Sequence, residues 1–165
     1  YPITINLFRR PYFDYSDIEK SIAYIVNRIE EEIGIIRLNL SNSDIVNERI
    51  LSLIDDYNKN LLCYELSNDA LTGKLQTVIP RDKVEILIRV RRTTYVINCL
   101  ISLFVRNIDF IDISLKRSGE DVKNFLNLSR LSQYESRINE LSTEKDKKIV
   151  TLELLEDYIS TEIIK

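Results

Sequence analysis

The basic cluster at Arg89, Arg91 and Arg92 is a group of side chains whose types and spacing could serve binding chemistry. From Arg81 to Arg92, five basic residues stand against two acidic ones, which leaves a local excess of three positive charges. Three arginines alone would make a weak, salt-sensitive DNA contact. The guanidinium group also suits subunit interfaces, because its planar fork pairs bidentately with carboxylates. We treat the three arginines as candidate interface or phosphate contacts, with a solvated or intramolecular role as the first expectation.

Residue types that support catalysis are scarce. The chain contains no His, which removes the usual metal ligand, the usual general base near neutral pH and the partner of a Ser or Cys nucleophile. Glu30–Glu32 and Asp55–Asp56 are not expected to bind a metal, because neighbouring helical residues do not face one another; each run predicts a solvated helical face. Cys63 and Cys99 lie in apolar patterns and predict buried free thiols, with a disulfide between them as the minor alternative. We expect no enzyme activity, metal, cofactor or small-molecule substrate.

Length and charge predict one soluble domain. A chain of 165 residues can bury a single core. The longest uncharged run, Thr93 to Val105, is shorter than the roughly 20 residues that cross a bilayer, so no membrane span is expected. The net charge of −3 argues against a generic nucleic-acid binder. No secretory signal is visible in this sequence. An intracellular location is expected, because the two cysteines are interpreted as free thiols of a reducing compartment.

The pattern divides the chain into an extended aromatic arm at 1–15, a helical domain at 16–145, and a linker with a short tail at 146–165. Gly and Pro, at three each, are too few for many tight turns, which favours long helices. Ser16 and Glu19 form an S-x-x-E capping box at the start of the first helix. Gly34 is its expected end, and the run from Ile33 to Leu40 could either continue the helix or form a short extended piece. Its apolar face recurs at intervals of three or four residues: Ile18, Ile22, Ile25, Ile29, Ile33 and Ile36.

A second amphipathic helix is predicted over about 44–66, capped by Ser43 or Asp44. Residues 67–79 show weak periodicity and are expected to form a connection.

The stretch that follows predicts a central buried helix. Asp82 and Glu85 have the spacing of a cap and an acid at the start of a helix, so the helix is expected to begin at about Asp82 and to reach Ile108. Its uncharged second half requires cover on nearly every side. Glu85 precedes Arg89 by four residues, the favourable order for a helical ion pair.

The sequence of the C-terminal third predicts further helices, followed by a tail that fits either a strand or a helix. Residues 120–141 read as two helices broken near 129–132, with a capping box at Ser132 and Glu135. The charged segment 145–148 reads as a solvated linker. Residues 149–155 fit both the period of a strand and that of a helix, and their β-branched start favours a strand. The predicted fold is an all-α bundle of about five helices around the central helix, with the tail strand as an option.

Two segments resemble the GINS family, the four-part replication factor of eukaryotes and archaea. The segment I-P-R-D-K-V-E-I-L-I-R-V-R-R-T-T-Y-V-I-N-C-L at 79–100 is similar to that family's buried helix with its R-R pair and following aromatic. The segment L-S-R-L-S-Q-Y-E-S-R-I-N-E-L at 128–141 resembles its L-S-x-x-E helix start, in the same order and spacing. The tail V-T-L-E-L-L-E-D at 150–157 resembles the first strand of a small β domain in one subunit class. The resemblance covers roughly 45–155, and the aromatic arm departs from it.

The resemblance implies a non-catalytic subunit that assembles with sister subunits by helix packing. Its implied partners are the replicative helicase and that helicase's cofactor protein, in the nucleus of a eukaryote or the cytoplasm of an archaeon. DNA contact would be weak. Two other classes stay open: a helical nucleic-acid-binding regulator that uses Arg89, Arg91 and Arg92, and a helical adaptor of viral or defence origin.

Overall fold

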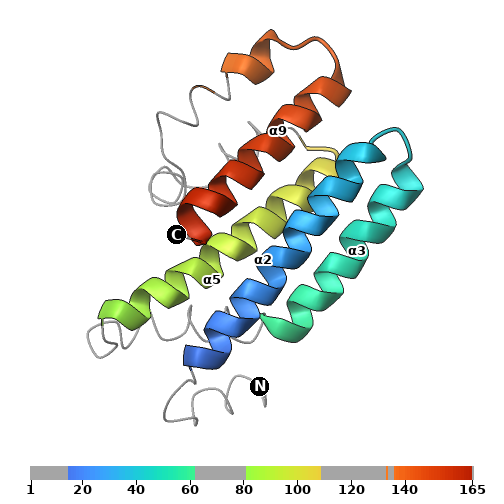
Figure 1. Ribbon diagram of the computed structural model, residues 1–165. Helices are drawn as coiled ribbons and strands as arrows, with labels where there is room; N and C mark the ends of the chain where they lie inside the picture. Colours follow the sequence, from blue (N-terminus) through green and yellow to red (C-terminus); the bar gives the residue numbers. More distant parts are fainter. Residues whose placement is uncertain (1–14, 62–80, 109–132, 134–135, 165) are drawn as a thin grey trace.

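A computed structural model describes residues 15–61, 81–108, 133 and 136–164 of the chain, and the statements below concern those residues. This part of the chain is built from helices and contains no β-strand, which confirms the predicted all-α class. The helices lie side by side as a bundle (Figure 1). Helix α2 contacts α3, α5 and α9, so it shares the centre of the bundle with α5. None of the helices described in these ranges is long and apolar enough to span a membrane.

Helix α2 spans Tyr15–Leu38, and its predicted isoleucine face is confirmed. Every isoleucine of that face, from Ile18 to Ile36, is buried. The expected end at Gly34 is wrong, because the helix continues for another turn. Ile36 keeps the apolar period past the glycine, and nothing in this turn requires a left-handed backbone.

Helix α3 spans Ser43–Asn60 and packs against α2. Its cap is Asn42 rather than Ser43 or Asp44, since the Asn42 side chain accepts a hydrogen bond from the Ile45 backbone N–H at 3.3 Å. The helix ends at Asn60, before the predicted end at about 66, and residues 62–66 lie outside the described residues. The predicted connection at 67–79 lies outside the described residues.

Helix α5 spans Arg81–Leu100 and continues as the π-helical segment η1, Ile101–Val105. Its start agrees with the predicted start at about Asp82. The second half is buried on more than one side, as expected: buried side chains are Val90, Thr93, Tyr95, Val96, Ile97, Cys99, Leu100, Leu103 and Phe104. Asn107, with a φ of 57°, turns the backbone after η1.

The C-terminal segment corrects two predictions. Residues 144–158 form helix α9, Glu144–Tyr158, which continues as η2, Ile159–Ile163. The strand predicted at 149–155 is therefore wrong, and the expected linker at 145–148 is the first part of the helix. Thr143 caps α9 by accepting a hydrogen bond from the Asp146 backbone N–H at 3.2 Å.

The segment predicted as a linker and short tail, 146–165, contributes side chains to the core over its described residues. Leu152, Leu155, Ile159 and Ile163 are each at most 1% exposed and belong to the same hydrophobic cluster as α2 and α5. Residues 1–14 of the predicted arm lie outside the described residues.

Candidate functional site

Two of the three clustered arginines bind the end of the C-terminal helix of the same chain. The Nε of Arg89 donates to the backbone carbonyl of Ile163 at 3.0 Å. The Nη1 of Arg92 donates to the carbonyl of Glu162 at 3.1 Å and lies 3.5 Å from its carboxylate. Arg91 is half-buried on the same helix. The intramolecular role expected first for this cluster is therefore found for Arg89 and Arg92.

The physical basis of this contact is the polarity of a helix end. The last carbonyls of a helix have no partner inside it, and they carry partial negative charge from the aligned peptide dipoles. Arg89 and Arg92 supply both hydrogen-bond donors and positive charge at that point. They stand on α5, about 70 residues earlier in the chain, so their contacts fix η2 against α5.

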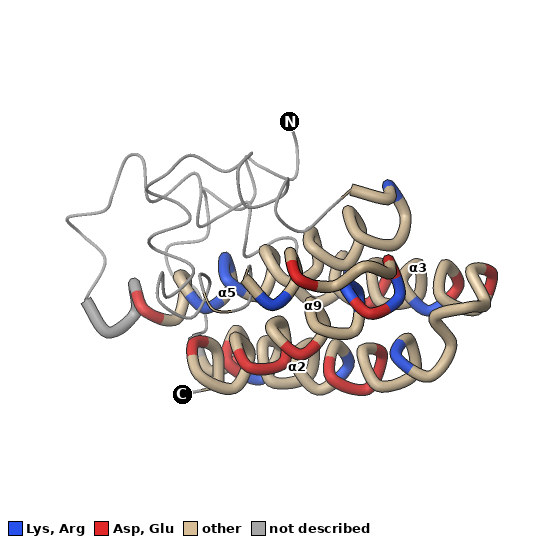
Figure 2. The backbone as a smooth tube through the Cα atoms, turned by 90° about the horizontal axis from the view of Figure 1, so that it is seen from above, with Lys and Arg blue, Asp and Glu red and all other residues tan. Residues whose placement is uncertain are grey.

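A groove lies beside this contact, between α5 and η2. Its volume is about 440 Å³, and it is lined by Glu85, Ile88, Arg89, Arg92 and Glu162. The α5 residues recur at intervals of three and four, so they occupy one face of that helix. Figure 2 shows the acidic and basic positions interspersed along the described helices. Among its described lining residues, the groove therefore presents charges of both signs around the apolar side chain of Ile88.

The ion pair predicted between Glu85 and Arg89 is not formed among the described residues. Arg89 donates to the Ile163 carbonyl instead, while Glu85 remains exposed. A carbonyl at a helix end competes well for the guanidinium, because an exposed pair of neighbouring side chains is worth only about 0.2–0.5 kcal/mol. Glu85 is thus left available to other partners at the groove.

The residues predicted to cap helices lie either inside the first turns of a helix or outside the described residues. Helix α2 begins at Tyr15, so Ser16 and Glu19 both lie inside its first turns. Asp82 lies in the first turn of α5. Ser132 and Glu135 lie outside the described residues.

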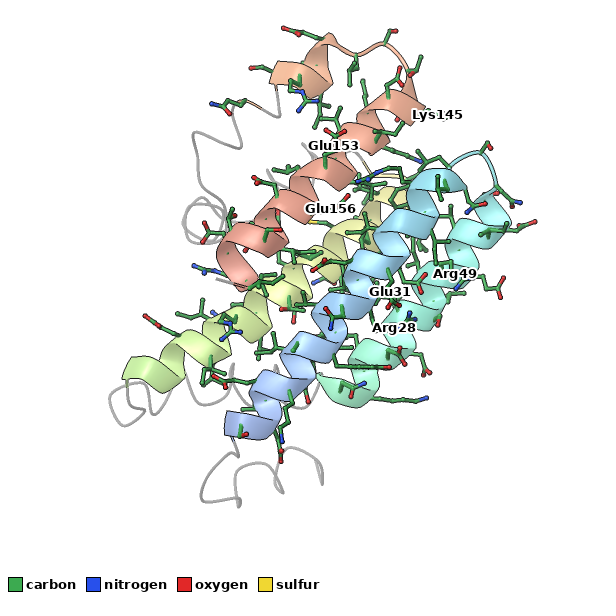
Figure 3. The ribbon with its side chains drawn as sticks, viewed as in Figure 1. Arg28, Glu31, Arg49, Lys145, Glu153 and Glu156 are labelled. Carbon is green, nitrogen blue, oxygen red and sulfur yellow. The ribbon has the colours of Figure 1, made fainter. Side chains whose placement is uncertain are left out.

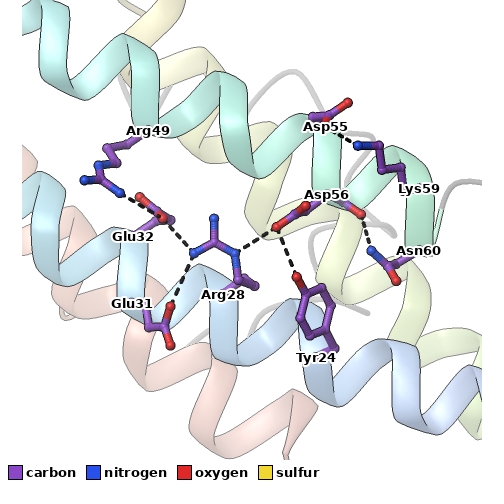
Figure 4. Close-up of polar contacts among 9 residues, drawn as sticks. All are labelled: Tyr24, Arg28, Glu31, Glu32, Arg49, Asp55, Asp56, Lys59 and Asn60. Carbon is purple, nitrogen blue, oxygen red and sulfur yellow. Dashed lines mark hydrogen bonds and ion pairs between the residues drawn. The ribbon is translucent and has the colours of Figure 1, made fainter.

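A second charged cluster joins α2 to α3, and sequence reasoning missed it. Arg28 donates from Nε to Asp56 at 2.8 Å, from Nη1 to Glu32 at 2.8 Å, and to Glu31 at 3.3 Å (Figure 4). Arg49 of α3 approaches Glu32 from the other side at 3.8 Å. Figure 3 shows the side chains of Arg28 and Glu31 on α2 and of Arg49 on α3, around the contact between the two helices.

Glu32 corrects the prediction of a solvated acidic face. Glu30 and Glu31 are exposed, but the Glu32 side chain is 0% exposed, and its Oε2 is buried without a hydrogen-bond partner. The i and i+4 spacing of Arg28 and Glu32 was a signal for this pair. Its burial depends on Asp56 and Arg49 of the neighbouring helix, which the local pattern does not reveal.

The electrostatics of Arg28 follow from these contacts. The hydrogen bond with Asp56 raises the pKa of Arg28 well above its ordinary value, burial opposes that rise, and Glu32 adds to it. The guanidinium therefore stays charged and holds carboxylates of two helices together.

Helix α9 has its own polar contacts to the bundle. Arg37 of α2 forms an ion pair with Glu156, and Arg137 donates to Glu153 at 3.3 Å. The ammonium group of Lys148 lies 5.1 Å from the centroid of the Phe104 ring, in the range of a cation–π contact. These contacts tie α9 to α2 and η1.

The arrangement as a whole serves helix packing. Among the described residues, no group of three or more His, Cys, Asp or Glu side chains is placed to hold a metal ion. The arginines Arg28, Arg37, Arg89 and Arg92 each bridge two helical segments. Comparison with family models, curated proteins and solved structures found no match to this chain.

Proposed function

We propose that this chain is a non-catalytic structural subunit of a DNA replication assembly of the GINS type. In this proposal it packs against sister subunits through its helices and bridges them to the replicative helicase and its cofactor protein. The replication context rests on the resemblance of residues 79–100 and 128–141 to that family.

The role of the arginine cluster is the observation that supports a structural subunit best. Arg89 and Arg92, which stand in the segment that resembles the family's buried helix, contact the end of η2 in their own chain. A phosphate-binding cluster would need its guanidinium groups directed at solvent, since nucleic-acid affinity comes from neutralising phosphates. Arginines that fix one helix against another suit a packing scaffold.

The proposal is tested by the mass of the native assembly. The chain is co-expressed with GINS-type sister subunits and helicase of its own organism, and the complex is weighed by native mass spectrometry. The expected result is one stable complex that contains the chain and its sister subunits. A monomer in the presence of those proteins, with no helicase bound, would refute the proposal.

A DNA titration by fluorescence anisotropy tests the nucleic-acid alternative in parallel. Three phosphate contacts would give log K against log salt a slope of about −2.7. The structural proposal expects weak binding that Arg91→Glu barely changes. Binding with that slope, lost in Arg91→Glu, would favour the regulator instead. The Arg91→Glu variant leaves the contacts of Arg89 and Arg92 with η2 in place.

A further inference from the structure

The groove between α5 and η2 has the size of a binding site but the lining of a protein interface. Its volume of about 440 Å³ falls in the range of roughly 300–1,000 Å³ found for ligand pockets. Such pockets are lined mainly by apolar and aromatic side chains. Four of the five described residues that line this groove are charged, and the apolar one is Ile88. Arg is enriched at protein–protein interfaces, and the rim of such an interface is polar.

The charged side chains that line the groove favour a protein partner over a nucleic acid. Arg92 already pairs with Glu162 across the groove, and both side chains are about a quarter exposed. This leaves Arg89, whose Nε is bound to Ile163, and the exposed carboxylate of Glu85. A phosphate backbone placed against Arg89 would meet Glu85 and Glu162, and like charges placed together cost several kcal/mol in order of magnitude. A protein segment that carries both signs avoids this repulsion.

The spacing on α5 defines the complementary pattern. Glu85, Ile88, Arg89 and Arg92 fall at i, i+3, i+4 and i+7 of one helix face, about 10 Å along the axis at 1.5 Å per residue. Ile88 is 37% exposed, and Ile164, just beyond η2, is 53% exposed. A partner helix laid along this face meets an acidic side chain, then an apolar one, then basic ones.

From this charge pattern we infer that the groove binds an amphipathic protein helix that carries a basic side chain for Glu85, an apolar anchor for Ile88 and an acidic side chain for Arg89. The inference rests on the proposed function, because it names how such a subunit engages a neighbour. Arg89 is already oriented by its bond to the Ile163 carbonyl, so less side-chain freedom is lost on binding.

The test places a photo-crosslinking benzoylphenylalanine at Ile88 of the full-length chain in extracts of its own cells, and maps the crosslinked peptide by mass spectrometry. A matched chain carries the same group at Leu51 of α3, which is 61% exposed and outside the groove. We expect a crosslinked protein at position 88 and not at position 51. The crosslinked helix of that protein should carry one basic and one acidic side chain on either side of an apolar residue. We expect Glu85→Lys to lower the yield of this crosslink about tenfold, because like charges then face each other. Glu48→Lys, an exposed charge reversal on α3, is expected to leave the yield unchanged.

The decisive step is rescue by the partner. Exchanging the partner's mapped basic residue for Glu should restore the crosslink to the Glu85→Lys chain. Absence of a crosslink at position 88, a nucleic-acid product, or a yield that ignores Glu85→Lys would each overturn the inference. A specific, charge-dependent crosslink to a protein outside replication would instead preserve the groove's role and refute the proposed function. An intact replication assembly without the crosslink would support the proposed function and refute the role of the groove.

Discussion

Replacing Arg28 with Ala tests whether the charged cluster between α2 and α3 holds the bundle together. Arg28 is the cation that contacts both Glu32 on its own helix and Asp56 on α3, each at 2.8 Å. Its removal leaves the carboxylate of Glu32 buried, with Arg49 at 3.8 Å as the remaining cation. The substitution should therefore lower the free energy of unfolding, because the buried charge of Glu32 is then poorly compensated.

The magnitude follows from the burial of the partners. Removing one partner of a fully buried ion pair costs about 3–5 kcal/mol, because the other charge stays out of water. Glu32 is 0% exposed, but the side chains of Arg28 and Asp56 are 21% and 25% exposed, so water screens part of the loss. Arg49 offsets a further part. We therefore expect the lower end of that range, about 3 kcal/mol of unfolding free energy.

Thermal unfolding followed by circular dichroism measures this change. For a domain of this length, a loss of about 3 kcal/mol lowers the Tm by about 6–12 °C. Lys59→Ala is the matched control, because it removes another cation beside a carboxylate of α3. The side chains of Lys59 and Asp55 are 69% and 64% exposed, and the Tm of this control should match that of the wild type.

A Tm for Arg28→Ala equal to that of Lys59→Ala would refute the reasoning. The double variant Arg28→Met with Glu32→Leu separates charge from packing. Replacing both buried charges by apolar side chains of similar volume is often neutral, so this variant should recover at least half of the lost Tm. A Tm as low as that of Arg28→Ala would mean that the lost hydrogen bond to Asp56, rather than the stranded Glu32 carboxylate, determines the cost.

The pH dependence of the same variant gives an independent check. The contacts of Arg28 raise its pKa in the folded state above the unfolded value. Stability from such a group is fully present below the unfolded pKa and is lost only as pH rises through the folded pKa. Since free arginine titrates above about pH 12, the Tm difference should stay constant from about pH 7 to pH 10. A difference that shrinks in that range would implicate another group.

Three further substitutions probe helix continuity, capping and the arginine contact. Gly34→Ala should raise the unfolding free energy by about 0.5–1 kcal/mol, because its Cβ would meet nothing within 4 Å and Ala favours the helix; a lower Tm would contradict this. Thr143→Ala should cost about 1 kcal/mol by removing the N-cap of α9, and an unchanged Tm would refute that role. Arg89→Ala should weaken η2 by about 1.5 kcal/mol and speed amide exchange at 159–164 roughly tenfold. Lys145→Ala, at the far end of α9, is the control for exchange, and equal rates in both variants would contradict the contact.

The isoleucine face of α2 was predictable because the helical period appears directly in the sequence. Each residue from Ile18 to Ile36 on that face is buried against α3, α5 or α9. The same period should have outweighed Gly34 as a stop signal. A glycine ends a helix when the backbone must turn left-handed, and the period continues at Ile36 without such a turn.

The fold of residues 149–155 was mispredicted because α9 is buried on several sides. Val150, Leu152, Leu154 and Leu155 are all at most 7% exposed, so the buried residues cover more than one face and form no narrow helical stripe. The informative signal was the cap. Thr143 lies three residues before Asp146, and the two side chains bond each other at 2.6 Å.

The partners of the charged side chains could not be read from the sequence, since they come from distant helices. Arg28 and Asp56 are 28 residues apart, and Arg89 and Ile163 are 74 apart. Local spacing instead favoured the pair of Glu85 with Arg89. The sequence therefore predicted that Arg89 makes a polar contact, but only the fold shows that its partner is the Ile163 carbonyl.

This division of roles along α5 determines which substitutions report on binding. Arg89 and Arg92 contact both the groove and the end of η2, so changing them alters packing and any partner contact together. Glu85 and Ile88 line the same groove on the exposed side of α5. A loss of assembly in Arg89 or Arg92 variants is consequently ambiguous, whereas a loss in Glu85→Lys with an unchanged Tm can only come from the groove surface.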